Sequence, residues 1–258
     1  MGHERLGLLP NNTKWRSVVS AIADLPEHDF RVDELVEKTL ANVQAQYRRL
    51  HTDPAVSAAF AFIVYLSSAS KADDPRQELR KIGIVLPDRP SLLAVATALQ
   101  HWLSQHQDSL ERSELARAAT ADALGSWYGF ARSDQKLLFT EDDPYRPWRN
   151  AASGAGFCEL SRFFFAKLTE RYLRFFLERE ASSALRTLEE RDRFSDELRK
   201  HIHRISEHAF ETSRITQSFA AGWFNKNTRQ GYPSPKEIEG FLAHAFGKMR
   251  EGLSREVA

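Results

Sequence analysis

FCELSRFFFAKLTERYLRFF, residues 157–176, is the segment that decides the fold predicted from this sequence. Apolar and aromatic side chains occupy most of its positions, and the polar residues of 157–180 fall in a narrow strip on one side of a helix. A helix with so narrow a polar face normally lies at the centre of a bundle, because little of its surface can favourably meet water. We therefore expect the other helices to pack around residues 157–180.

A polar and aromatic loop, residues 141–150 (EDDPYRPWRN), leads into this helix. Trp, Tyr and Arg dominate energetic hot spots at protein interfaces, and long loops held by a rigid scaffold often carry binding functions. We therefore predict that Tyr145, Arg146, Trp148 and Arg149 bind a partner protein. The alternative is that these rings cover the core, with the neighbouring prolines stiffening a connector.

The rest of the chain also reads as helices. Apolar residues recur at three- and four-residue spacing over 13–24, 33–50, 55–70, 91–105 and 108–131. Asp53, followed by Pro54, and Ser91 are residue types that begin helices well. Residues 82–86 (IGIVL) form the only serious strand candidate.

A second apolar stripe runs over residues 194–224 and predicts a single long helix, and residues 235–249 predict a shorter final one. We expect an all-α fold, a multi-helix bundle or array with one or two very long C-terminal helices and at most one short strand pair. The polar composition of the loop favours a boundary there. This boundary gives three parts: an N-terminal helical array (1–132), a connector loop (133–156) and a C-terminal long-helix bundle (157–258). A single continuous domain fits the sequence equally well.

Composition indicates an ordinary globular protein. Hydrophobic residues make up 42% of the 258 residues and charged residues 28%, which is atypical of disordered chains. The formal net charge of +1 provides no global attraction to nucleic acid or anionic membranes. The longest apolar run, residues 58–66, is too short for a membrane span. Because no secretory signal is evident, we expect a cytoplasmic protein without a membrane partner.

The sequence does not favour a metal site, a reactive cysteine or a phosphate-binding loop. Glu197, His201 and His208 share one flank of the predicted long helix, but no second helix offers a matching ligand pair, so we predict no metal site and no other cofactor. Cys158 lies near a helix start, where a thiol pKa can fall, yet its apolar neighbours favour a small buried residue. Residues 153–156 (SGAG) precede a helix, but the lysine of a Walker motif is missing.

Nucleic-acid binding is the main alternative function. Arginine and lysine interleaved with aromatic residues can bind single strands by stacking and phosphate contact. This chemistry occurs on the apolar helix and in a loop near the C-terminus, at Lys167, Arg171, Arg174, Lys226, Arg229 and Tyr232. Acidic residues are interspersed on the helix, and the nearly neutral net charge argues against a dedicated nucleic-acid domain.

We therefore expect a helical interaction or scaffold subunit of a larger intracellular protein assembly, without catalysis of its own. It would bind one or more protein subunits, and the final helix could also serve self-association. The alternative is a nucleic-acid-associated helical protein that binds DNA or RNA through its basic and aromatic residues. An enzyme with a site gathered from distant helices is a third reading that a linear sequence does not address.

Overall fold

The computed structural model describes residues 16, 18–20, 22, 48–106, 110–133, 143–212 and 217–256. Within these ranges the chain is mostly helical and has no strand, which confirms the expected all-α class. In chain order the elements are η1 (Arg48–Thr52), α3 (Pro54–Ala69), α4 (Pro75–Lys81), α5 (Leu92–Ser104), α6 (Leu110–Ser133), α7 (Arg146–Ala151), α8 (Gly154–Ala184), α9 (Leu188–Thr212), α10 (Gln217–Asn227) and α11 (Pro235–Glu256).

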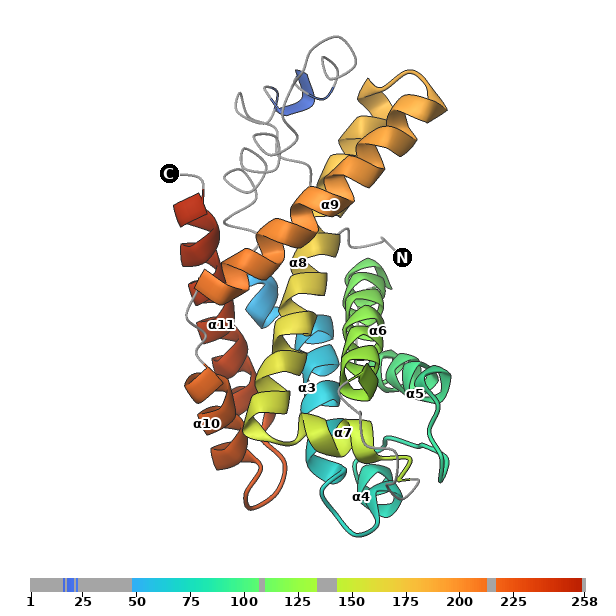
Figure 1. Ribbon diagram of the computed structural model, residues 1–258, viewed down its shortest axis with the longest axis vertical. Coiled ribbons are helices and arrows are strands. Elements are labelled where there is room, and N and C mark those ends of the chain that lie inside the picture. The colour runs from blue at the N-terminus through green and yellow to red at the C-terminus, as the bar shows by residue number, and fades with distance from the viewer. Residues whose placement is uncertain are drawn as a thin grey trace.

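Helix α8 is the central element, as its composition predicts. It spans 31 residues and contacts α6, α7, α9 and α10. In Figure 1, α6 lies along one side of α8, α3 lies behind it, and α9 leans across its upper half. Phe157, Phe164, Phe165 and Phe176 are all fully buried, so most of the aromatic run lies in the interior of the fold, whereas Phe163 and Phe175 are partly buried.

Helix α3 is the second core element. Oδ1 of Asp53 accepts hydrogen bonds from the backbone N–H groups of Ala55 (2.9 Å) and Val56 (3.2 Å), which confirms the predicted N-cap. At the middle of α3, the ring of Phe60 stacks on Phe241 of α11 with ring centroids 5.1 Å apart, and lies 5.2 Å from the ring of Phe164. Rings from α3, α8 and α11 therefore meet in one aromatic cluster.

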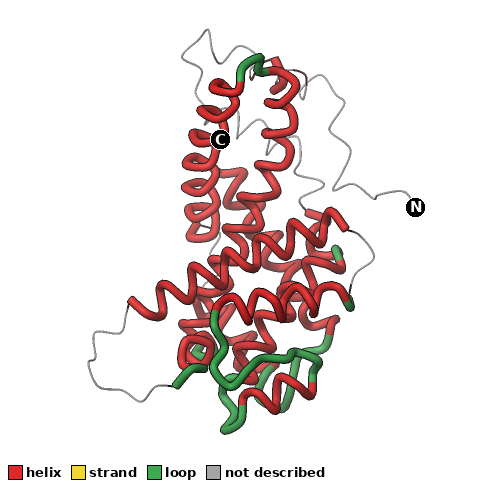
Figure 2. Tube along the Cα trace, turned by 90° about the vertical axis from the view of Figure 1, so that its right-hand side faces the viewer, coloured by secondary structure: helices red, strands yellow, loops and turns green. Residues whose placement is uncertain are grey.

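Most described loops lie at the lower end of the molecule, whereas the turn between α8 and α9 lies at the upper end (Figure 2). The lower end holds α4, α5 and α7 (Figure 1). Helix α5 begins as expected, because Oγ of Ser91 accepts a hydrogen bond from Ala94 N–H at 3.1 Å. This end therefore carries the short helices and connectors in which surface sites often occur.

The single long helix expected over residues 194–224 is not confirmed. Helix α9 ends at Thr212 and α10 begins at Gln217, and residues 213–216 lie outside the described ranges. The two halves of the apolar stripe meet different ends of α8, since Ser195 of α9 donates a hydrogen bond to Glu178 near the end of α8, whereas α10 packs on α8 near its start. There Phe224 stacks on Phe157 with centroids 4.2 Å apart.

Residues 82–86 form no strand: residues 82 and 83 make a turn, and residues 84–86 follow without regular secondary structure. Gly83 adopts a φ of 86°. Its N–H donates a hydrogen bond to the carbonyl of Arg80, and the N–H of Ile84 donates one to the carbonyl of Leu79 at 2.9 Å. This pair of bonds closes α4 in a Schellman motif, which needs a left-handed residue such as glycine. The alternating pattern that resembled a strand buries Ile84 and leaves Val85 60% exposed.

One cluster of buried hydrophobic residues extends from Val18 to Met249. The helices on either side of residues 133–156 therefore share a core, and the division into domains stays a prediction. Among the described residues, no helix combines the length and apolarity that crossing a lipid bilayer requires.

Candidate interaction surfaces

The predicted partner-binding residues lie on and beside α7, and their rings point inward. Trp148 is fully buried and Tyr145 is 5% exposed. The hydroxyl of Tyr145 donates to the carbonyl of Pro87 at 2.9 Å, which ties α7 to the segment after α4. Trp127 Nε1 of α6 donates to the carbonyl of Pro147, also at 2.9 Å. These rings therefore cover and complete the core, the alternative that the loop composition left open.

The two arginines of this group lie nearer to the surface. Arg149 is exposed, and its Nε donates to the carbonyl of Ser70 at 2.9 Å while Nη1 pairs with Oδ2 of Asp143 at 2.7 Å. Arg146 is half-buried. The structure thus separates the four residues into two buried rings and two guanidinium groups, because a short helix packed on α3, α6 and α8 turns its aromatic side inward. Any partner contact here falls to the arginines.

The small-residue run before α8 is a tight helix-to-helix turn. Ser153 caps α8, since its Oγ accepts from Gly156 N–H at 2.9 Å and donates to the carbonyl of Asn150 at 2.9 Å. A Cβ atom on Gly154 would lie 2.8 Å from Cβ of Ala221, and one on Gly156 would lie 2.1 Å from the carbonyl oxygen of Asn150. The glycines therefore serve close packing, and the first amides of α8 have a side-chain acceptor of the chain's own.

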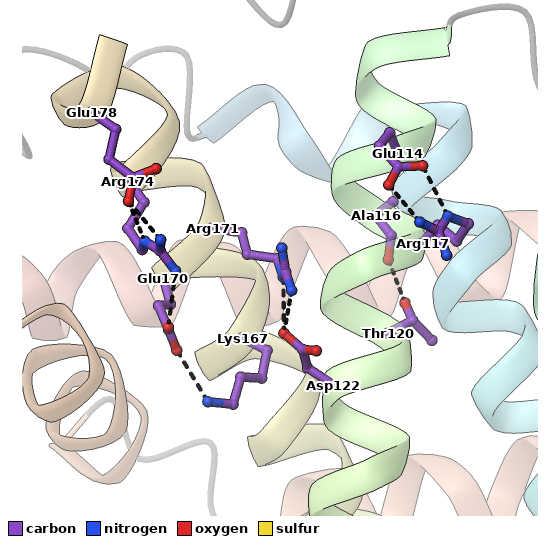
Figure 3. A network of polar contacts seen from close by, with 10 residues as sticks. All are labelled: Glu114, Ala116, Arg117, Thr120, Asp122, Lys167, Glu170, Arg171, Arg174 and Glu178. Atoms are coloured by element: carbon purple, nitrogen blue, oxygen red, sulfur yellow. Dashed lines mark hydrogen bonds and ion pairs between the residues drawn. The ribbon is translucent and has the colours of Figure 1, made fainter. Parts of the chain in front are cut away.

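The basic strip predicted on α8 is paired with acids (Figure 3). Lys167 Nζ lies 3.1 Å from Glu170, and Arg174 donates to Oε1 of Glu178 through Nε (2.9 Å) and Nη2 (2.5 Å). The third cation of the strip, Arg171, pairs with an acid on a different helix, α6.

Arg171 Nε and Nη2 both donate to Oδ2 of Asp122 on α6, at 2.9 and 2.6 Å. Polyanion binding by this strip would have to compete with three intramolecular carboxylates.

The paired strip borders a groove between α6 and α8, with a volume of about 370 Å³. Its lining consists of Glu114, Leu115, Ala118, Arg171, Arg174, Phe175 and Glu178. The apolar members come from both helices and the charged members carry both signs. Sequence reasoning found the cations and the acids interspersed on the same helix, but it missed Asp122, which lies 49 positions before Arg171 in the chain.

The second predicted nucleic-acid group begins in the last turn of α10, with Lys226, and continues into the loop that follows. Lys226 and Arg229 are exposed, whereas Tyr232 is half-buried with its ring edge-on to Tyr65 at a centroid distance of 5.3 Å. Burial, and to a smaller extent the charge of Glu78, raises the pKa of the Tyr232 hydroxyl. The ring therefore packs on the protein, and its exposure for base stacking is limited.

The predicted absence of a metal site remains a prediction. Among the described residues, no group of three or more histidine, cysteine, aspartate or glutamate side chains gathers as a metal would require. The side chains of His201 and His208 lie outside the described part. Cys158 is half-buried, and burial is the main cause that raises the pKa of its thiol, with Glu159 adding to the effect and Arg162 opposing it. A raised pKa disfavours the nucleophilic thiolate.

An apolar groove beside α5 was missed by sequence reasoning. It has a volume of about 490 Å³ and is lined by Val85, Pro87, Ser91, Leu93, Ala94, Thr97, Ala98 and His101. Two large apolar side chains of this lining are strongly exposed, Val85 at 60% and Leu93 at 77%.

A signal for this groove does exist in the sequence. Leu93 lies off the buried stripe of Val95, Leu99 and Leu103, and Val85 alternates with two buried residues. Each is unremarkable alone, and only the fold brings the two together.

Comparisons with protein-family models, curated proteins and solved structures find no match for this chain. Its function must therefore be argued from its own surfaces.

Proposed function

We propose that this protein is a helical interaction subunit of an intracellular protein assembly, and that it binds a partner protein through the groove beside α5. One observation carries the proposal: Val85 and Leu93, both more than half exposed, line the same groove. Contiguous exposed apolar surface with a polar rim is typical of protein interaction sites.

The chemistry of the groove supports an apolar segment of a partner protein as the occupant. The described residues that line it include no Asp, Glu, Lys or Arg. Depletion of charge at the centre of a contact is characteristic of protein interfaces. The groove is bounded by α5 and by the chain after α4, which Tyr145 holds to α7 through its bond to Pro87. A wall anchored in this way presents a preformed surface, which lowers the entropy cost of binding.

Nucleic-acid binding, the second reading, has less support. Exposed Lys226 and Arg229 favour it, but the three α8 cations predicted for this function, Lys167, Arg171 and Arg174, are each paired with a carboxylate. Titration with a mixed oligonucleotide pool over a salt series separates the two functions. Affinity that falls steeply with salt would favour nucleic acid, whereas the interaction subunit shows none at physiological salt.

A photo-crosslinking residue at position 93 tests the docking surface in the native cell. We expect one discrete adduct from position 93 and none from position 188, because Leu188 is equally exposed, at 74%, but lies outside the groove. The captured protein is then purified and its affinity measured. Leu93→Asp should weaken binding at least about tenfold, because burying an unpaired carboxylate costs several kcal/mol.

Equal adducts from both positions, or unchanged affinity of Leu93→Asp for the captured protein, would contradict this assignment. An adduct with a second copy of the chain would show that the groove serves self-association and does not bind a different protein.

A further inference from the structure

The groove between α6 and α8 combines an apolar floor with both signs of charge. Leu115 and Ala118 contribute from α6, and Phe175 contributes from α8, where its ring is held edge-on to Phe176 at 5.3 Å. Among the described residues, the lining also includes two glutamates and two arginines, Glu114, Glu178, Arg171 and Arg174. A floor with few but fixed polar groups is the usual construction of a small-molecule site.

Both arginines retain hydrogen-bonding capacity toward the groove. Each donates through Nε and Nη2 to a single carboxylate oxygen, and within the described part of the chain neither forms a hydrogen bond through Nη1. Nη1 of Arg174 lies 3.9 Å from Oε1 of Glu170, which is an ion pair without a hydrogen bond. A guanidinium has five N–H donors. Each of the two arginines can therefore also donate to a ligand carboxylate while it keeps its hydrogen bonds to Asp122 or Glu178.

The acids are also held in place. Ser195 of α9 donates to Oε1 of Glu178 at 2.9 Å, and Arg117 donates to both carboxylate oxygens of Glu114 at 2.9 and 2.5 Å. The pKa of Glu114 is lowered chiefly by its hydrogen bond from Arg117, with further contributions from the charges of Arg117 and Arg171. Arg171 is on the facing helix, so the two walls of the groove interact electrostatically (Figure 3).

Among the described residues of the lining, the formal charges of the two glutamates and two arginines cancel, which disfavours a polyanion and suits a ligand that carries one charge of each sign. We propose that the groove between α6 and α8 binds a small zwitterion with an apolar side group, the class of free apolar amino acids and short apolar peptides. The carboxylate lies against Arg171 and Arg174, the ammonium against Glu114, and the apolar group on Phe175.

Calorimetric titration of the full chain tests this assignment, with L-phenylalanine and the dipeptide Leu-Phe as separate probes. The expected dissociation constant for the amino acid is on the order of 1 mM, as the usual affinity per non-hydrogen atom implies for a ligand of this size. N-acetyl-phenylalanine, which lacks the cation, and phenylalanine amide, which lacks the anion, should each bind at least about tenfold more weakly. The relative affinities of the two probes distinguish an amino-acid site from a peptide site.

Arg174→Gln should weaken zwitterion binding about tenfold or more, since a charged hydrogen bond is lost. Arg193→Gln is the matched control, because Arg193 also pairs with a glutamate four residues later (3.3 Å) but lies on α9 outside the groove. Thermal unfolding of each variant reports folding, and Glu114→Gln provides a second test if Arg174→Gln is not folded.

Loss of binding in Arg174→Gln or Glu114→Gln, with binding retained in Arg193→Gln, supports the site. The proposal is overturned if neither probe binds, if single-charge derivatives bind as well as the zwitterion, or if folded groove variants bind like the wild type. Because these readouts do not involve the α5 groove, the site can fail without bearing on the proposed docking function.

Discussion

Replacing Gly156 by alanine should destabilise the whole fold, because the turn between α7 and α8 leaves no room for a Cβ atom. That atom would lie 2.1 Å from the carbonyl oxygen of Asn150 and 2.9 Å from Oγ of Ser153. Neither neighbour can yield at low cost. The first is backbone in the turn, and the second caps α8 through its bond from Gly156 N–H.

The magnitude follows from three opposing effects. Overpacking typically costs about 1–3 kcal/mol, and disturbing the cap costs about 1 kcal/mol more. The better helix propensity of alanine offsets about 1 kcal/mol. The net loss in the free energy of unfolding is therefore about 2 kcal/mol. At about 2–4 °C per kcal/mol for a chain of this size, Tm should fall by about 4–8 °C.

Gly240→Ala is the matched control. Gly240 is an exposed position within α11, and a Cβ atom there would meet nothing within 4 Å. The same substitution should stabilise the protein by about 0.5–1 kcal/mol. Urea unfolding followed by far-UV circular dichroism measures both variants. A Gly156→Ala protein as stable as the wild type, beside a stabilised Gly240→Ala protein, would refute the steric reasoning.

Three further outcomes are expected. Trp148→Ala should lower the free energy of unfolding by about 3–5 kcal/mol, as for a buried aromatic residue, whereas Leu188→Ala at an exposed position should stay within about 0.5 kcal/mol. Equal effects in urea unfolding would show that the ring of Trp148 does not support the core. Tyr145→Phe removes the hydrogen bond to Pro87 and should cost about 0.5–1.5 kcal/mol, measured in the same way; a neutral result would contradict that bond. The raised pKa of Cys158 reduces the thiolate fraction at mildly alkaline pH, so iodoacetamide should modify the native protein more slowly than the urea-unfolded chain. Faster native modification would instead indicate an activated thiol.

Several local features follow directly from the order of residues. The N-caps at Asp53 and Ser91 are formed by a side chain and an amide two or three residues away, so nearby sequence contains both partners. The apolar run of α8 predicts its central place, because a helix with so narrow a polar strip has no favourable position at the surface. Local pattern therefore determined the helical class and most of the core.

Which aromatic residues are exposed was decided by packing between distant elements. Tyr145 and Trp148 have the composition of a binding loop, yet their burial depends on α3, α6 and α8 and on a bond to Pro87, 58 positions earlier. The continuous stripe over 194–224 likewise predicts one helix, since periodicity does not report that α9 and α10 pack against different ends of α8.

The aromatic run of residues 157–176 by itself determined that this protein is built around one central helix, because burying its apolar surface is the dominant favourable term in folding. The surfaces were decided only by the tertiary structure. The docking groove needs Val85 and Leu93 from separate elements, and the cations of α8 meet acids that include Asp122 of another helix. Charge pairing and exposure depend on distances in space, and those distances are set by how the helices pack.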